Sequence, residues 1–219
     1  MARNLNLTRG GASTKLYSSP GACSLSILIA LREAGIDFEG IKVNLQTHKF
    51  ANGEDYYAIS PRGYVPLVEF DDGSRHTEAA PLLQYIGDLD PQRALIPPAG
   101  SPGRLAVLEW LTFVSTELHK TFSPWFWQAQ TAESTKVACR AKLATRFAEL
   151  DRALAGREYL TSRFTVADAY AFMIVNWSRM LAINLSPYPH LEAYLARVAA
   201  RPKVLETLLL EGLLKADAA

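Results

Sequence analysis

The spacing of hydrophobic and polar positions changes part-way along the chain. Over the first 90 residues, short apolar stretches typical of strands are interleaved with stretches of helical spacing. The predicted strands cover residues 15–17, 38–45, 65–70 and 74–76, and the predicted helices cover residues 24–34, 53–59 and 79–89. This order, βαβαββα, favours a mixed sheet flanked by helices.

No strand pattern continues beyond residue 90. Residues 91–103 are rich in proline and glycine, a composition typical of a linker. Helices are predicted over residues 104–122, 134–155, 166–183, 190–200 and 203–214. The sequence therefore predicts an α/β domain over residues 15–90 and an all-α domain over residues 104–219. The polar residues 1–14 are predicted to be a loose N-terminal extension.

Composition narrows the class of protein. The 219 residues carry a formal net charge of +1, which gives no general attraction to nucleic acid or to anionic membranes. No apolar stretch approaches the roughly 20 residues that span a bilayer. Two cysteines do not make a disulfide framework, and residues 1–14 contain no apolar export signal. We expect a reduced, cytoplasmic protein with no nucleic-acid or membrane partner.

One cysteine lies where its chemistry matters. The stretch YSSPGACSLS, residues 17–26, places Cys23 after a Pro-Gly turn and at the start of the first predicted helix. Unpaired N–H groups and the helix dipole at that end favour an anion, so we expect a lowered pKa and a reactive thiol. Cys23 and Ser26 form a C-x-x-S spacing, which permits a mixed disulfide but no internal resolution. A small buried hydrophobic residue is the alternative from this stretch alone.

Two further stretches suggest ligand contacts. In SPRGYVPLVEF, residues 60–70, a cis bond between Val65 and Pro66 would leave the Val65 backbone free for an extended peptide, and an edge-strand proline is the alternative. In HTEAAPLLQYI, residues 76–86, Glu78 precedes a helix whose N-terminus could hold a carboxylate. The Glu78 carboxylate could accept from an ammonium group of the same ligand. A ligand with both a carboxylate and an ammonium group would be an amino acid or the γ-glutamyl end of a peptide. Ordinary helix capping also explains this pattern.

The stretch EWLTFVSTELHKTFSPWFW, residues 109–127, has a polar stripe beside an apolar one. On a regular helix, Thr112, Thr116, His119 and Ser123 fall within a wedge of about 60°. Such a stripe is typical of a helix that faces a ligand, although a lone histidine there is also compatible with a structural role. The tryptophans that follow could line an apolar pocket.

Taken in order, the motifs PGACSLS, GYVP, TEA and ELHK resemble those of the bacterial beta-class glutathione S-transferases. The similarity runs from about Lys15 to near the C-terminus. It implies a thioredoxin-like N-terminal domain, a C-terminal α-helical bundle, a homodimer, and reduced glutathione bound as co-substrate between the domains. The implied activity is transfer of glutathione to small electrophiles, with thiol transfer through Cys23 beside it. The alternatives are a glutaredoxin-like oxidoreductase and a non-catalytic protein on the same scaffold.

The resemblance also assigns site residues. The implied catalytic residues are Cys23 and His119. The implied glutathione-binding residues are Cys23, His48, Val65, Pro66, Glu78, Ala79, Thr112, Thr116, Glu117, Leu118, His119 and Lys120. No metal is expected, because the four histidines show no ligand spacing.

Three of these positions depart from the family pattern. Ala79 lacks a hydroxyl often present there, and Thr112 stands where the family has an asparagine. His48 stands where the family often has a lysine, whose role the neighbouring Lys49 could take. Each change alters one hydrogen bond, so weaker glutathione binding is expected. Away from the site, the stretch Thr165–Asp168 is predicted to be a structural capping box.

Overall fold

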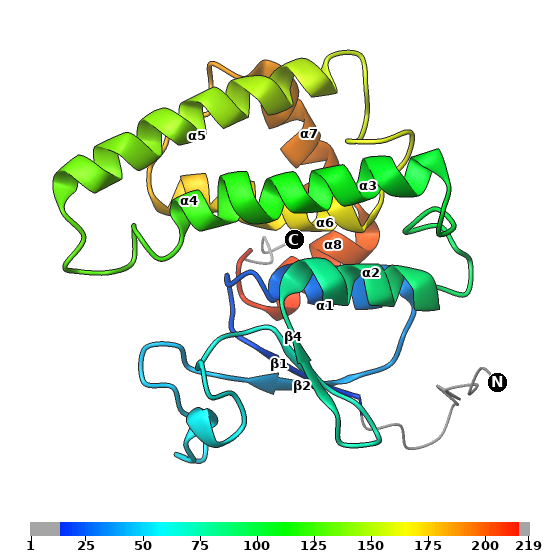
Figure 1. Cartoon of the computed structure of the whole chain (residues 1–219), viewed down its shortest axis with the longest axis vertical. Helices are drawn as coiled ribbons and strands as arrows, with labels where there is room; N and C mark the ends of the chain where they lie inside the picture. Colours follow the sequence, from blue (N-terminus) through cyan, green and yellow to red (C-terminus); the bar gives the residue numbers. More distant parts are fainter. Residues whose placement is uncertain (1–13, 215–219) are drawn as a thin grey trace, which may run out of the picture.

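The N-terminal domain is a small sheet with two helices on one face (Figure 1). The computed structural model describes residues 14–214, so the predicted extension lies outside it except for Thr14. The elements are β1 Lys15–Ser18, α1 Leu25–Ala34, β2 Glu39–Lys42, the 3-10 turn η1 Tyr56–Ala58, β3 Leu67–Glu69, β4 Arg75–Thr77 and α2 Ala79–Leu89. The predicted order βαβαββα is confirmed, with its second helix reduced to the single turn η1.

The sheet has the strand order β2-β1-β3-β4. Strand β1 runs parallel to β2 and antiparallel to β3, with Leu16 opposite Gly40 on one side and Val68 on the other. The crossover α1 joins the two parallel strands and ends at Gly35, whose φ of 65° is the left-handed conformation that glycine adopts without strain. In Figure 1, α1 and α2 lie between the sheet and the helical domain.

The C-terminal domain is entirely helical. Its elements are α3 Pro102–Phe113, the π-helix η2 Val114–His119, α4 Lys120–Phe122, α5 Glu133–Leu154, α6 Val166–Met180, α7 Pro189–Ala199 and α8 Pro202–Leu210. The first predicted helix of this domain is therefore continuous in sequence but contains one wider π turn. None of the helices within residues 14–214 is both long enough and apolar enough to cross a membrane.

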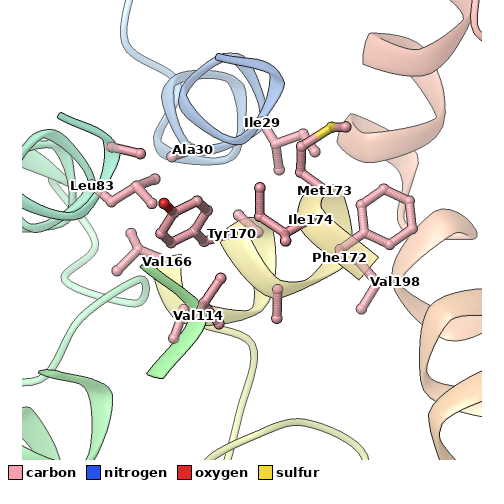
Figure 2. Close-up of a cluster of buried hydrophobic side chains, with 14 of the residues drawn as sticks. Ile29, Ala30, Leu83, Val114, Val166, Tyr170, Phe172, Met173, Ile174 and Val198 are labelled. Atoms are coloured by element: carbon pink, nitrogen blue, oxygen red, sulfur yellow. The ribbon is translucent and has the colours of Figure 1, made fainter. Parts of the chain in front are cut away.

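Helix α6 joins the two domains. It packs against α1 and α2 as well as against α3 and α7. Almost all of its side chains are buried, which fits its apolar sequence. Figure 2 shows Tyr170 and Ile174 of α6 among Ala30 of α1, Leu83 of α2 and Val114. One hydrophobic core therefore spans both domains and fixes their relative position.

The linker between the domains is held by specific bonds. The Asp90 carboxylate accepts hydrogen bonds from the backbone N–H groups of Ala94 and Leu95 at 2.7 and 3.1 Å. The Leu95 carbonyl in turn accepts from the N–H of Val166 at the start of α6. Arg104 donates to the Pro97 carbonyl at 2.8 Å. The proline-rich composition thus predicted an irregular segment but not its close attachment to the helical domain.

Candidate functional site

Cys23 lies on the turn before α1, not within the helix. The helix begins at Leu25, with Ser24 as its N-cap residue. The Cys23 side chain is 8% exposed, and its Sγ–H donates to the backbone carbonyl of Val65 at 3.3 Å. The turn that leads to β3 therefore meets the cysteine turn through one direct sulfur–oxygen contact.

Burial raises the pKa of the Cys23 thiol to about 12. The charge of Lys120 and the backbone N–H groups at the helix start oppose that change, but they do not offset the loss of solvation. The prediction of a lowered pKa was therefore wrong. The helix terminus does favour a thiolate, and the surrounding protein, which the local sequence does not report, removes the water that a thiolate needs.

Cys23 is therefore expected to react slowly with alkylating reagents. In a Cys139→Ser variant, which leaves Cys23 as the one thiol, alkylation by iodoacetamide at pH 8 should be on the order of 100-fold or more slower than that of free glutathione. Mass spectrometry of timed samples measures the rate. The same variant in denaturant supplies the control and should react at the rate of an ordinary thiol. Rapid alkylation of the folded variant would show that Cys23 is ionised and accessible.

Val65 presents its backbone next to this cysteine. The Val65–Pro66 peptide bond is cis, as the resemblance implied, and both residues are buried. Strand β3 begins directly afterwards at Leu67. The Val65 segment therefore lies beside the Cys23 turn, between that turn and the start of β3.

Glu78 and Ala79 stand at the start of α2. Glu78 is the N-cap residue and has a φ of 70°, unusual for a residue other than glycine. Its exposed carboxylate pairs with Arg62 at 2.9 Å, while Ala79 is 5% exposed. This end of the helix can bind a carboxylate through its N–H groups, and the Glu78 side chain can bind an ammonium group.

His119 approaches the same place from the helical domain. Its Nδ1 lies 2.7 Å from the Tyr170 hydroxyl, and its ring meets that of Trp177 edge-on at 5.1 Å between centroids. Trp177 donates from Nε1 to the Gly21 carbonyl at 2.8 Å, which links the helical domain to the cysteine turn. Burial, with a smaller contribution from Lys120, lowers the pKa of His119 to about 4. The imidazole is therefore neutral at physiological pH.

The comparisons with known proteins agree with this geometry. Residues 21–89 match the model of the glutathione S-transferase N-terminal domain, and residues 113–202 match that of the C-terminal domain. The chain belongs to the glutathione S-transferase family. It is 40% identical to glutathione S-transferase GstA of Escherichia coli O157:H7 over 91% of this chain and 99% of that protein.

Solved structures give the same family and its class. A sphingomonad glutathione S-transferase complexed with glutathione is 41% identical, with a TM-score of 0.85 over 91% of this chain and 100% of that one. A beta-class glutathione S-transferase of Sphingomonas chungbukensis is 39% identical, with a TM-score of 0.86 over the same shares. The beta-class resemblance of the motifs is thereby confirmed.

Two of the site residues that the family pattern implied have their side chains elsewhere. The Glu117 carboxylate pairs with Arg146 at 2.7 Å and with Lys142 at 3.3 Å, both on α5, and Leu118 is fully buried in the core. Both residues lie in the π turn, whose wider i→i+5 spacing changes the angle between successive side chains. The 60° wedge calculated for a regular helix therefore does not apply through this segment.

The threonines of the predicted stripe are exposed and bond within their own helix. The Thr116 hydroxyl donates to the Thr112 carbonyl at 2.9 Å, and the Thr112 hydroxyl donates to the Leu108 carbonyl at 2.8 Å. Their oxygen atoms can still accept hydrogen bonds from a ligand. Lys120, also exposed, provides the positive charge closest in sequence to His119.

His48 lies against the loop that leads to Val65. Its ring stacks on Tyr57 with 4.7 Å between centroids, and its Nδ1 is buried without a hydrogen-bond partner among the described residues. A Cβ on Gly63 would come within 2.7 Å of both rings, so that position requires glycine. Lys49 next to it is exposed.

Tyr170 and Trp177 of the largely buried helix α6 were not among the site residues that the resemblance implied. In the structure they are the direct partners of His119. Their spacing of seven residues, two helical turns, places two polar-tipped aromatic side chains on one face of α6. That pattern was a usable signal, because buried tyrosine and tryptophan normally find a hydrogen-bond partner. The ring of Trp127 packs against that of Trp177, with 4.8 Å between their centroids.

Proposed function

We propose that this chain binds reduced glutathione between its two domains and transfers it to small electrophiles, with Cys23 as an un-ionised hydrogen-bond donor. The observation that carries this proposal is the bond from the Cys23 thiol to the Val65 carbonyl, made by a buried sulfur whose pKa is raised. A thiol that keeps its one proton can turn it from the Val65 carbonyl to a neighbouring anion. The anion to be stabilised is the glutathione thiolate.

The arrangement of the site supports this placement of the tripeptide. The backbone of Val65 would pair with the cysteinyl residue, and Glu78 and Ala79 would hold the γ-glutamyl end. His48, which lies against Gly63 of the Val65 loop, and its neighbour Lys49 would serve the glycyl carboxylate. Thr112, Thr116 and Lys120 would border the site from the helical domain. Pro66 shapes the turn without contributing a donor.

Cys23, His119 and Lys120 would share one task. Each favours negative charge on the glutathione sulfur: the first two by donating hydrogen bonds and the third by its charge. The thiol proton of glutathione leaves to solvent. The thiolate then provides the electron pair for a new sulfur–carbon bond, and the leaving group of the electrophile departs with its own bonding pair. Holding both reactants in contact supplies the remainder of the acceleration.

The raised pKa of Cys23 favours conjugation over thiol transfer through this residue. Attack of Cys23 on a disulfide requires its thiolate, and burial disfavours that form. A donor role requires the thiol, which burial preserves. A glutaredoxin-like main activity is therefore the less favoured alternative.

The experiment compares wild type with Cys23→Ser and Cys23→Ala. Conjugation is followed with chlorodinitrobenzene, thiol transfer with hydroxyethyl disulfide, and the pKa of bound glutathione by thiolate absorbance. Serine keeps a donor, so conjugation should stay within about threefold of wild type, whereas alanine should lower kcat about tenfold and raise the pKa of bound glutathione. The variant Cys139→Ser, distant in sequence and partly exposed, is the control.

Loss of conjugation in Cys23→Ser with rapid thiol transfer by wild type would contradict the donor role and favour the oxidoreductase. Binding of glutathione by wild type with no turnover in either assay would favour the non-catalytic alternative. Two further expectations remain part of the proposal: a homodimer, measured by light scattering, and a cytoplasmic location, measured by cell fractionation.

A further inference from the structure

We propose that Tyr170 is a positioning residue that holds His119 in the tautomer with its proton on Nε2, so that this N–H can be directed at the glutathione sulfur. The inference rests on the proposed function for the use of that proton. Its first half, the tautomer, concerns the protein alone.

The geometry of one contact carries the inference. The Tyr170 hydroxyl lies 2.7 Å from Nδ1 of His119, a short and well-formed hydrogen bond between side chains 51 positions apart. The two rings are perpendicular, with centroids 5.9 Å apart. Trp177 meets the His119 ring edge-on as well, so the imidazole is confined between two aromatic side chains of α6.

The direction of this bond follows from the partners of Tyr170. Among residues 14–214, its hydroxyl has one hydrogen-bond partner, Nδ1 of His119, and burial raises its pKa far above the ordinary value. Tyr170 therefore always carries its proton. Since no other acceptor among these residues lies within hydrogen-bond distance, the phenol proton points at Nδ1. A neutral imidazole that accepts at Nδ1 must carry its own proton on Nε2.

The charged and titratable groups around this pair are few and identifiable. Lys120 lies on the same helical segment as His119 and opposes its protonation. From the other elements, Cys23 on the turn before α1 and Glu78 at the start of α2 both act on Tyr170. The pair therefore lies within electrostatic range of the two positions proposed for the sulfur and the γ-glutamyl end of glutathione.

Tyr170 holds the imidazole of His119 in a fixed position, although His119 itself belongs to a π turn. Tyr170 is 1% exposed and lies within the core that joins the domains, as Figure 2 shows. Its hydroxyl is thus fixed relative to α1 and α2, the helices that begin after Cys23 and Glu78. The bond to Nδ1 transmits that fixed position to the imidazole.

The test uses the full-length protein and the variant Tyr170→Phe, which removes one oxygen atom. In wild type without glutathione, ¹⁵N NMR should show His119 protonated on Nε2 and unprotonated on Nδ1. In Tyr170→Phe, both tautomers should be populated and the pKa of His119 should rise by about one unit, because a donor that fits only the neutral ring is gone. The kcat for conjugation should fall about tenfold, with the KM for glutathione within about twofold.

The matched control is Tyr194→Phe. Tyr194 is a second fully buried tyrosine, and its hydroxyl donates to Asp168 at 3.1 Å and has no bond to His119. This variant should lose stability and keep the wild-type tautomer, pKa of His119 and kcat. An unchanged His119 tautomer in Tyr170→Phe would overturn the inference, whatever happens to kcat. Absence of conjugation by wild type, together with the expected NMR spectra, would instead overturn the proposed function and leave the tautomer assignment standing.

Discussion

Replacing Asp168 with alanine should lower the free energy of unfolding by about 3 to 5 kcal/mol, because it leaves several buried donors without a partner. The Asp168 side chain is fully buried near the start of α6 and forms the predicted capping box with Thr165. Its carboxylate accepts from the N–H groups of Leu160 and Thr165 at 2.9 and 2.8 Å. It also accepts from the hydroxyls of Thr165 and Tyr194 at 3.0 and 3.1 Å. Urea denaturation followed by circular dichroism measures the change.

The control is Asp151→Ala. Asp151 accepts one backbone N–H, that of Leu191 at the start of α7, at 2.9 Å. This variant should lose only about 1 kcal/mol, the usual value for one cap. Equal losses in the two variants would contradict the view that Asp168 joins several segments. Conjugation by Asp168→Ala, measured well below its unfolding temperature, should stay near wild type, because Asp168 does not touch the site residues.

Replacing His119 with glutamine should remove a large pH dependence of stability. The pKa of His119 is about 4 in the folded chain, against an ordinary value near 6.5, so the unfolded chain takes up the proton first as the pH falls. The stability associated with the neutral ring is complete above pH 6.5 and is lost as the pH falls from 6.5 to 4. When the pH falls from 7 to 5, wild type should lose about 2 kcal/mol more of its unfolding free energy than His119→Gln loses.

The comparison of wild type with His119→Gln is necessary because Asp168 changes the stability with pH in the opposite direction. Burial raises the pKa of Asp168 to about 6 despite its donors, so its contribution is present at low pH and is lost as the pH rises through 6. Both proteins retain Asp168, so its contribution cancels in the difference. His190→Gln, at an exposed position on α7, is the matched control and should follow wild type. An identical pH dependence of wild type and His119→Gln would contradict burial of a neutral His119.

The sequence predicted local features well where neighbouring residues decide them. Gly35 ends α1, Thr165 and Asp168 form the capping box of α6, and α2 spans Ala79–Leu89 as expected. These features depend on backbone conformation and on hydrogen bonds within a few positions, which a short window of sequence contains. The order of the four motifs was sufficient for the family for the same reason: each is a local stretch with its own pattern.

The site was less predictable, since its properties arise between distant segments. The residues next to Cys23 in sequence indicate a helix terminus, which favours a thiolate and a lower pKa. They do not report the burial of Cys23, which involves the Val65 segment and raises its pKa. The bond of His119 to Tyr170 crosses 51 positions, and the salt bridges of Glu117 reach α5. The sequence by itself determined the fold, the family and the positions of the reactive groups along the chain. Only the tertiary structure decided their protonation, because the solvation of a buried group depends on all the segments that exclude water from it.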